Sequence, residues 1–93
     1  MILNITFSVD KEVAEDWISW MKDKHIPDLL ANGSFTEFKI MKVLSHDDER
    51  TFSYAVQYFR GSMKNIQEYL DSDDIQKRYG ERVLAYPTLL EEV

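Results

Sequence analysis

Four short segments of the chain alternate hydrophobic and polar side chains, and two segments of helical periodicity lie between them. Alternation at every second position is typical of a strand that has one buried face. The strand-like segments are Ile2–Val9, Phe35–Leu44, Thr51–Phe59 and Arg82–Leu90. The helical segments are Lys11–Lys24 and a stretch that begins after Ser62. The order of elements is therefore strand, helix, strand, strand, helix, strand.

This order predicts a ferredoxin-like βαββαβ fold of the α+β class, in which one four-stranded antiparallel sheet carries both helices on one face. With this connectivity, Ile2–Val9 and Thr51–Phe59 become the central, adjacent strands. The other two strands lie at the edges, where Pro87 is tolerated because no ladder hydrogen bond is needed from it. A chain of 93 residues suits one domain, so we expect a single domain over residues 1–93.

The first helix has a wide apolar and aromatic face. Asp10 stands where a helix N-cap is expected, because its carboxylate can accept from the first free N–H groups. At 100° per residue, one arc of the helix collects most of the apolar side chains. These are Val13, Ala14, Trp17, Ile18, Trp20, Met21 and His25. Pro27 predicts that the helix breaks near Ile26 and restarts as a short turn through Leu29 and Leu30 before Gly33.

The second helix has a narrower apolar stripe. We expect Ser62 to cap its start, and the side chains expected to point inward are Met63, Ile66 and Leu70. The acidic stretch Asp71–Asp74 should interrupt the helix, and Ser72 should cap a last turn that ends before Gly80.

The two faces of the predicted sheet differ in character. One face is apolar and large enough for a core: Leu3, Ile5, Phe7, Val9, Phe52, Tyr54, Val56 and Tyr58. The other face carries a central polar strip: Asn4, Thr6, Ser8, Ser53, Ala55 and Gln57. In one interpretation this strip faces water, as one side of an antiparallel sheet often does.

The edge strands favour a second interpretation. They add more apolar side chains than one helix layer should cover: Met41, Val43, Leu84, Tyr86 and Leu90. A second copy of the chain, laid face to face, would bury this surface around the polar strip. The resulting homodimer would enclose a narrow cavity with a few polar groups, which is typical of a small-molecule pocket.

The charge and composition limit the partners. Eleven Lys and Arg against seventeen Asp and Glu leave a net charge of −6. An acidic chain repels phosphate, so we expect no nucleic acid and no membrane as partner. The start of the chain leads into a strand instead of a signal region, and no apolar run approaches the ~18 residues of a membrane span. We therefore expect a cytoplasmic protein.

Seven side chains are candidates for ligand binding, and each also has a structural interpretation. His25 either closes the end of the first helix or serves as a base or ligand donor at a pocket mouth. Trp17 and Trp20 are either core residues or an aromatic pocket wall. Tyr54 and Tyr58 share a strand face and either support the core or line a pocket. Asn4 and Gln57 are the groups that would orient a ligand in an enclosed strip.

Metal and cofactor sites are not indicated. The chain has two histidines, His25 and His46, far apart in sequence, and it has no cysteine. This spacing gives no support for zinc. The acidic stretch Asp71–Asp74 lacks the glycine and the terminal glutamate of a calcium loop. No glycine-rich phosphate loop is present, so we expect no metal and no organic cofactor.

Four segments of the chain together carry a family resemblance. They are Trp17–Met21 (WISWM), His25–Pro27 (HIP), Tyr54–Tyr58 (YAVQY) and Thr88–Glu91 (TLLE). With these segments the chain resembles a family of small bacterial proteins catalogued as a domain of unknown function. The resemblance spans nearly the whole chain. It implies a ferredoxin-like fold similar to the dimeric α+β barrel proteins, which include cofactor-independent monooxygenases and small degradative enzymes.

Three hypotheses of function follow. The first is a homodimer that binds a small apolar or aromatic metabolite in a cavity beneath the sheet, without a metal or an organic cofactor. The second is a non-catalytic module for protein interaction or regulation. The third is an enzyme similar to the cofactor-independent monooxygenases. The chain shows no compact set of acid, base and nucleophile, so whether it is an enzyme stays open.

Overall fold

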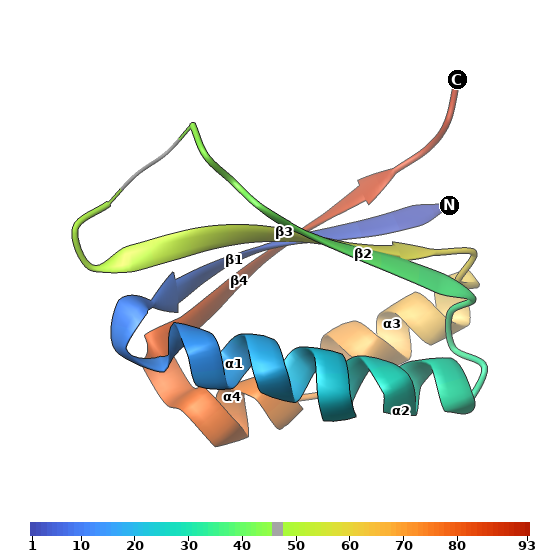
Figure 1. The fold of residues 1–93 in the computed structure, drawn as a ribbon. Helices are drawn as coiled ribbons and strands as arrows, with labels where there is room; N and C mark the ends of the chain where they lie inside the picture. The colour runs from blue at the N-terminus through green and yellow to red at the C-terminus, as the bar shows by residue number, and fades with distance from the viewer. Residues whose placement is uncertain (46–47) are drawn as a thin grey trace.

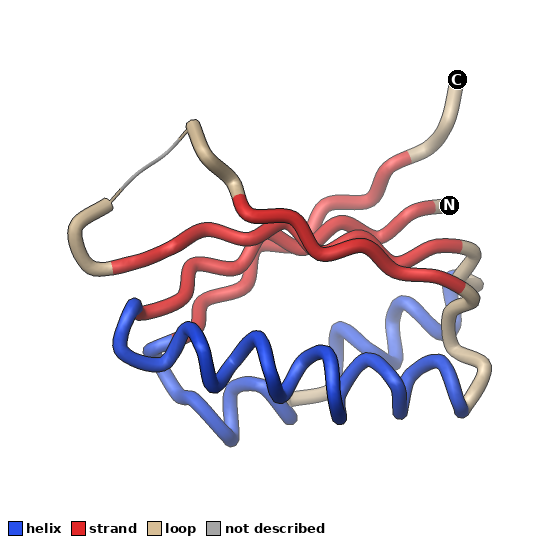
Figure 2. The backbone as a smooth tube through the Cα atoms, viewed as in Figure 1, coloured by secondary structure: helices blue, strands red, loops and turns tan. Residues whose placement is uncertain are grey.

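In the described residues, 1–45 and 48–93, four strands form one antiparallel sheet and all helices cover one of its faces (Figure 1). The strands are β1 (Ile2–Asp10), β2 (Glu37–Lys42), β3 (Thr51–Phe59) and β4 (Val83–Leu90). This computed structural model has the strand order β2-β3-β1-β4. The predicted ferredoxin-like α+β fold is confirmed, with both chain ends at one end of the sheet (Figure 2).

The register places β1 and β3 at the centre, as predicted. Ile5 lies opposite Val56 on one side and opposite Pro87 on the other. Strands β2 and β4 each have one free edge, and the edge position of β4 accommodates its Pro87. β2 is shorter than predicted because its first expected residue, Phe35, turns into the core instead of pairing.

The first helical segment runs from Lys11 to Ala31 without interruption. It joins a 3-10 turn (Lys11–Val13), α1 (Ala14–Trp20), a π-helical turn (Met21–His25) and α2 (Ile26–Ala31). The predicted break near Ile26 is wrong. The backbone N–H of Ile26 donates to the carbonyl of Met21, five residues back. This wider turn places Pro27 in the first turn of α2, where a missing N–H is tolerated.

The second helical segment is interrupted, as predicted. It consists of α3 (Met63–Asp71), α4 (Asp74–Tyr79) and a 3-10 turn (Gly80–Arg82). Ser62 caps α3 by accepting from the backbone N–H of Asn65 at 3.0 Å. The role expected for Ser72 is wrong, because its hydroxyl closes α3 by donating to the carbonyl of Tyr69 at 2.7 Å.

The buried stripe of α3 differs from the predicted one. Ile66 and Tyr69 are buried, whereas Met63 and Leu70 are exposed. Residues three and four apart share one side of a helix, so Leu70 lies on the same side as Ile66, but it borders a hollow against the sheet and stays 37% exposed. The sequence pattern of aliphatic residues therefore missed the aromatic residue that enters the core.

The core lies between the helices and the sheet. From the sheet it takes the predicted alternating residues Leu3, Ile5, Phe7, Val9, Tyr54, Val56 and Tyr58, and from the helices Ala14, Trp17, Met21, Ile26, Ile66 and Tyr69. Phe52, which was also expected on this face, is only half-buried. No helix in the described part of the chain is long and apolar enough to cross a membrane.

Candidate functional site

The sheet separates the predicted site residues into two groups. Asn4 and Gln57 lie on the face without helices, named here the helix-free face, where they stand opposite each other on β1 and β3. The other five lie on the helix side: His25, Trp17, Trp20, Tyr54 and Tyr58. One site does not contain all seven side chains.

The centre of the helix-free face is a strip of neutral polar groups. Besides the Asn4–Gln57 pair, β1 and β3 place Thr6 opposite Ala55 and Ser8 opposite Ser53. These side chains are half-buried against one another. Amide and hydroxyl groups are present in this strip, and they can both donate and accept hydrogen bonds.

Apolar side chains border the strip on both sides. On β4, the exposed fractions are 45% for Leu84, 57% for Tyr86 and 38% for Leu90. The register with Ser8, Thr6 and Ile2 places these three on the helix-free face. On β2, Met41 lies opposite Ala55 and is 44% exposed, and the charged side chains of Lys39, opposite Gln57, and Glu37, opposite Phe59, lie on the same face. The predicted surplus of apolar surface on this face is therefore present in the folded chain.

On the helix side, three buried side chains form a chain of hydrogen bonds. The distance from His25 Nε2 to the Tyr69 hydroxyl is 2.8 Å, and the distance from that hydroxyl to the Tyr58 hydroxyl is also 2.8 Å. The π-helical turn supplies His25, α3 supplies Tyr69 and β3 supplies Tyr58. Sequence reasoning missed Tyr69, although an aromatic residue three positions after Ile66 on an amphipathic helix was a signal for it.

One direction of hydrogen bonding satisfies all three groups. If the Tyr58 hydroxyl donates to Tyr69 and the Tyr69 hydroxyl donates to His25 Nε2, every O–H in the chain has an acceptor. A proton on Nε2 would reverse both bonds and leave the buried Tyr58 O–H without an acceptor among the described residues. The geometry therefore favours a neutral imidazole that carries its proton on Nδ1.

The electrostatics agree with this assignment. Burial lowers the pKa of His25, and the carboxylates of Asp74 and Asp28 act in the opposite direction. Burial raises the pKa of the Tyr58 and Tyr69 hydroxyls. All three groups are consequently uncharged near neutral pH.

The two tryptophans have different environments. Trp17 is fully buried, with its ring 5.1 Å from that of Phe7 and 5.3 Å from that of Tyr54, which is a core position. Trp20 is half-buried, and its ring stacks on the His25 ring at 4.7 Å. Trp20 is therefore the tryptophan that reaches a surface hollow.

A hollow of about 370 Å³ lies between the first helical segment and α3, and it is named here the helix groove. Its lining includes Trp20, His25, Asp28, Glu68, Tyr69 and Asp74. Because the second helical segment is broken after Asp71, the backbone link between α3 and α4 borders this groove.

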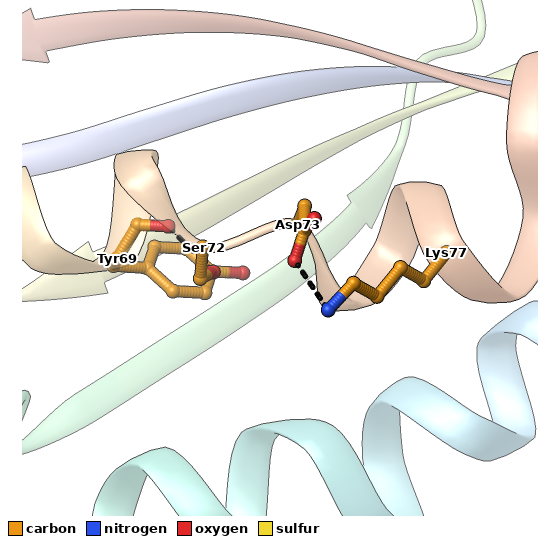
Figure 3. Close-up of polar contacts among 4 residues, drawn as sticks. All are labelled: Tyr69, Ser72, Asp73 and Lys77. Carbon is orange, nitrogen blue, oxygen red and sulfur yellow. Dashed lines mark hydrogen bonds and ion pairs between the residues drawn. The ribbon is translucent and has the colours of Figure 1, made fainter.

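Side chains hold that link in place (Figure 3). Ser72 bonds back to the carbonyl of Tyr69, and Lys77 forms an ion pair with Asp73 at 3.2 Å. A second hollow, of about 320 Å³, lies on the other side of the link against β4, with Ile5, Leu70 and Ala85 among its lining residues.

No group of three or more His, Asp or Glu side chains within residues 1–45 and 48–93 is arranged to hold a metal ion. His46 lies outside the described residues.

The comparisons with known proteins concern the whole chain. A family model described as "Domain of unknown function (DUF4286)" matches residues 1–93. No curated protein matches the chain. The fold is similar to the crystal structure of an ethyl tert-butyl ether degradation (EthD) family protein from Bacillus halodurans C-125, with a TM-score of 0.61 and 11% sequence identity. The match covers 98% of this chain and 100% of that one.

Proposed function

The chain belongs to this family of unknown function, and we propose that it acts as a homodimer that binds a small apolar or aromatic molecule between the helix-free faces of two copies. The observation that carries the proposal is the composition of this face. A neutral polar strip runs along β1 and β3, and exposed apolar side chains border it on β2 and β4. Exposed apolar side chains of this kind favour burial against a partner.

A second copy fits this face for two reasons. Packing two identical faces about a two-fold axis buries all the apolar side chains of the face at once. The free edges also differ in charge: β2 carries Lys39 and Lys42 against one acidic residue, Glu37, whereas Glu91 and Glu92 follow β4. Opposite charges favour the β2 edge of one copy beside the β4 edge of the other.

The polar strip supports a ligand. Once two faces close, the amides of Asn4 and Gln57 would lie in an apolar surrounding, where unpaired polar groups are costly. A small molecule with one or two polar atoms satisfies these groups and fills the apolar remainder. The EthD protein with the similar fold has a name that refers to a small ether, and a molecule of that size and polarity is an example of the expected class.

The oligomeric state is the first test. Light scattering at micromolar concentration should return the mass of two chains. Tyr86→Lys places a charge in the middle of the face and should yield the mass of one chain. Met63→Lys, an exposed apolar residue on α3, is the matched control and should leave the mass unchanged. A wild-type monomer would contradict the proposal and favour an interaction module that offers the same face to another protein.

Ligand binding is the second test. A thermal-shift series with small aromatic and apolar compounds, including indole and p-cresol, should show a saturable rise in melting temperature for at least one of them. The double variant Asn4→Ala and Gln57→Ala should lose that response and keep the dimeric mass. Gln67→Ala, on the exposed side of α3, should keep both. A response that survives loss of both strip amides would place the ligand elsewhere.

A further inference from the structure

We propose that the helix groove is a second binding site, which takes a small organic cation that also carries a hydrogen-bond acceptor, as an amino alcohol does. The site lies within one chain and does not depend on the homodimer. Three observations carry this inference: the size of the groove, the unused nitrogen of His25 and the net negative charge of the lining residues.

The groove has the dimensions of a ligand site. Its volume of about 370 Å³ lies within the range of small-molecule pockets. The half-buried Trp20 ring forms part of its wall. An aromatic wall offers a ligand apolar contact, and this ring already stacks on His25 and has the Arg78 guanidinium 5.3 Å away.

The second observation is a ring nitrogen of His25 that makes no hydrogen bond to the described residues. The residue lines the groove and is 6% exposed as a whole. Tyr69 is the one hydrogen-bond partner of this ring within the described residues, and it engages Nε2. In the described part of the chain, Trp17 Nε1 is the one fully buried side-chain nitrogen or oxygen without a hydrogen-bond partner. His25 Nδ1 also has no partner there, so it must keep some exposure to solvent. The Nδ1–H of His25 is thus a largely buried hydrogen-bond donor without an acceptor among the described residues.

The third observation is the charge of the groove. Four charged side chains line it, and two of them neutralise each other, because Lys24 and Asp28 form an ion pair at 3.2 Å. Glu68 and Asp74 form no ion pair within residues 1–45 and 48–93. With His25 neutral, the residues that line the groove carry a net charge of −2, and the nearby Arg78 guanidinium beside Trp20 offsets part of it. This balance favours a cation over an anion.

The ligand class is tested with four molecules that share a phenyl ring. They are 2-amino-1-phenylethanol, 2-phenylethylamine, 1-phenyl-1,2-ethanediol and mandelate. Titrations followed by amide chemical shifts should show saturable binding of the amino alcohol, with shifts at the residues that line the groove. The amine without hydroxyl and the uncharged diol should each bind more weakly, and mandelate should not bind. Equal binding of the amino alcohol and the diol, or no binding of the amino alcohol up to about 10 mM, would overturn the proposal.

Charge variants test where the cation lies. The double variant Glu68→Gln and Asp74→Asn should lower the affinity for 2-amino-1-phenylethanol by roughly three- to tenfold, as expected for two partly exposed charges. Glu15→Gln with Glu92→Gln changes the net charge by the same amount outside the groove and should leave the affinity unchanged. Equal losses in the two double variants would mean nonspecific attraction, against the proposal.

The pH dependence tests the role of His25. Charged and titratable groups near its ring are Lys24, Asp28, Glu68, Tyr69 and Asp74, and Arg78 on α4 lies 5.3 Å from the Trp20 ring that stacks on it. Protonation of His25 adds a positive charge to the groove, so affinity for the amino alcohol should fall between pH 8 and pH 5.5 and fall less in His25→Gln. Tyr86→Lys should bind the amino alcohol as the wild type does, which separates this site from the sheet-face proposal. An equal fall in both proteins would contradict the role of His25.

Discussion

Among individual residues, Tyr69 has the central position in the polar part of the core. Its hydroxyl is the only link between His25 on the first helical segment and Tyr58 on β3 within the described residues. Buried polar groups are stable in a core when each finds a partner, and they are costly when one is left unpaired. The two tyrosines therefore differ in importance, because the Tyr69 hydroxyl takes part in two hydrogen bonds and the Tyr58 hydroxyl in one.

Replacing the two tyrosines by phenylalanine should have different effects. Tyr69→Phe removes the acceptor of Tyr58 and the donor to His25, and should lower the free energy of unfolding by about 1–3 kcal/mol. Tyr58→Phe removes the last hydroxyl of this row of hydrogen bonds and leaves the Tyr69–His25 bond intact. It should lower the free energy of unfolding by less than about 1 kcal/mol. Urea denaturation of both variants measures the difference. Equal losses would contradict the assigned direction of the hydrogen bonds.

The stability should fall in mild acid because of His25. Burial holds the pKa of His25 in the folded chain below the ordinary value of 6.5, which applies to the unfolded chain. As the pH falls through 6.5 and down to the folded pKa, the unfolded chain binds the proton first and is favoured.

His25→Gln tests this prediction, because glutamine keeps a polar partner for Tyr69 and does not titrate in that range. The free energy of unfolding, measured from pH 8 to pH 5, should decline more steeply in the wild type than in the variant. Parallel declines would show that the carboxylates alone cause the acid sensitivity.

At the level of elements, turns and junctions adjust the two helical segments to the sheet. The π-helical turn continues the first segment past Pro27, and the link after Asp71 bends the second. In the junction between β3 and α3, Gly61 lies close against the side chain of Phe35. A Cβ atom at Gly61 would overlap the Phe35 ring and would stand 2.7 Å from its Cδ1 atom.

Gly61→Ala should therefore lower the free energy of unfolding by about 1–3 kcal/mol, because either the buried ring or the backbone has to move. The loss should be smaller when Phe35 is replaced by leucine, so a double-mutant cycle in urea should show coupling between the two positions. Gly33→Ala is the control without a steric neighbour, and its cost should arise from the positive φ of 78° alone and show no coupling to Phe35. Additive effects at positions 61 and 35 would contradict the steric explanation.

For the molecule as a whole, the two sides of the sheet carry different structural features. The helix side contains the core and the helix groove, and the helix-free face carries the surface proposed for dimerisation. Asn4 and His25, which the sequence analysis grouped together as candidate ligand-binding residues, lie on different sides of the sheet. A disturbance of one side should therefore leave the other intact.

A homodimer formed through the helix-free face should make the melting temperature depend on concentration. Dissociation is favoured by dilution, so calorimetry over a hundredfold range of chain concentration should show a rising melting temperature for the wild type. Tyr86→Lys should show a lower melting temperature that does not change with concentration. A wild-type melting temperature that is equally constant would contradict association through this face.

Much of the fold was predictable because strand and helix periodicities are local. The alternation in Ile2–Val9 and Thr51–Phe59 identified the central strands and their core side, and Asp10 and Ser62 marked helix starts that the structure confirms. The predicted helix break near Ile26 and the predicted burial of Leu70 were wrong. Both depend on how the helices pack against the sheet, which local patterns do not contain.

The order of elements, the two chemically distinct sheet faces and the negative charge can be read from the chain alone, since each depends on neighbouring residues and backbone geometry. Which polar groups meet depends instead on the packing of distant segments. His25 and Tyr69 stand 44 positions apart, and their contact follows from the packing of two helical segments against β3. The separation of Asn4 and Gln57 from His25 likewise depends on the sheet that lies between them.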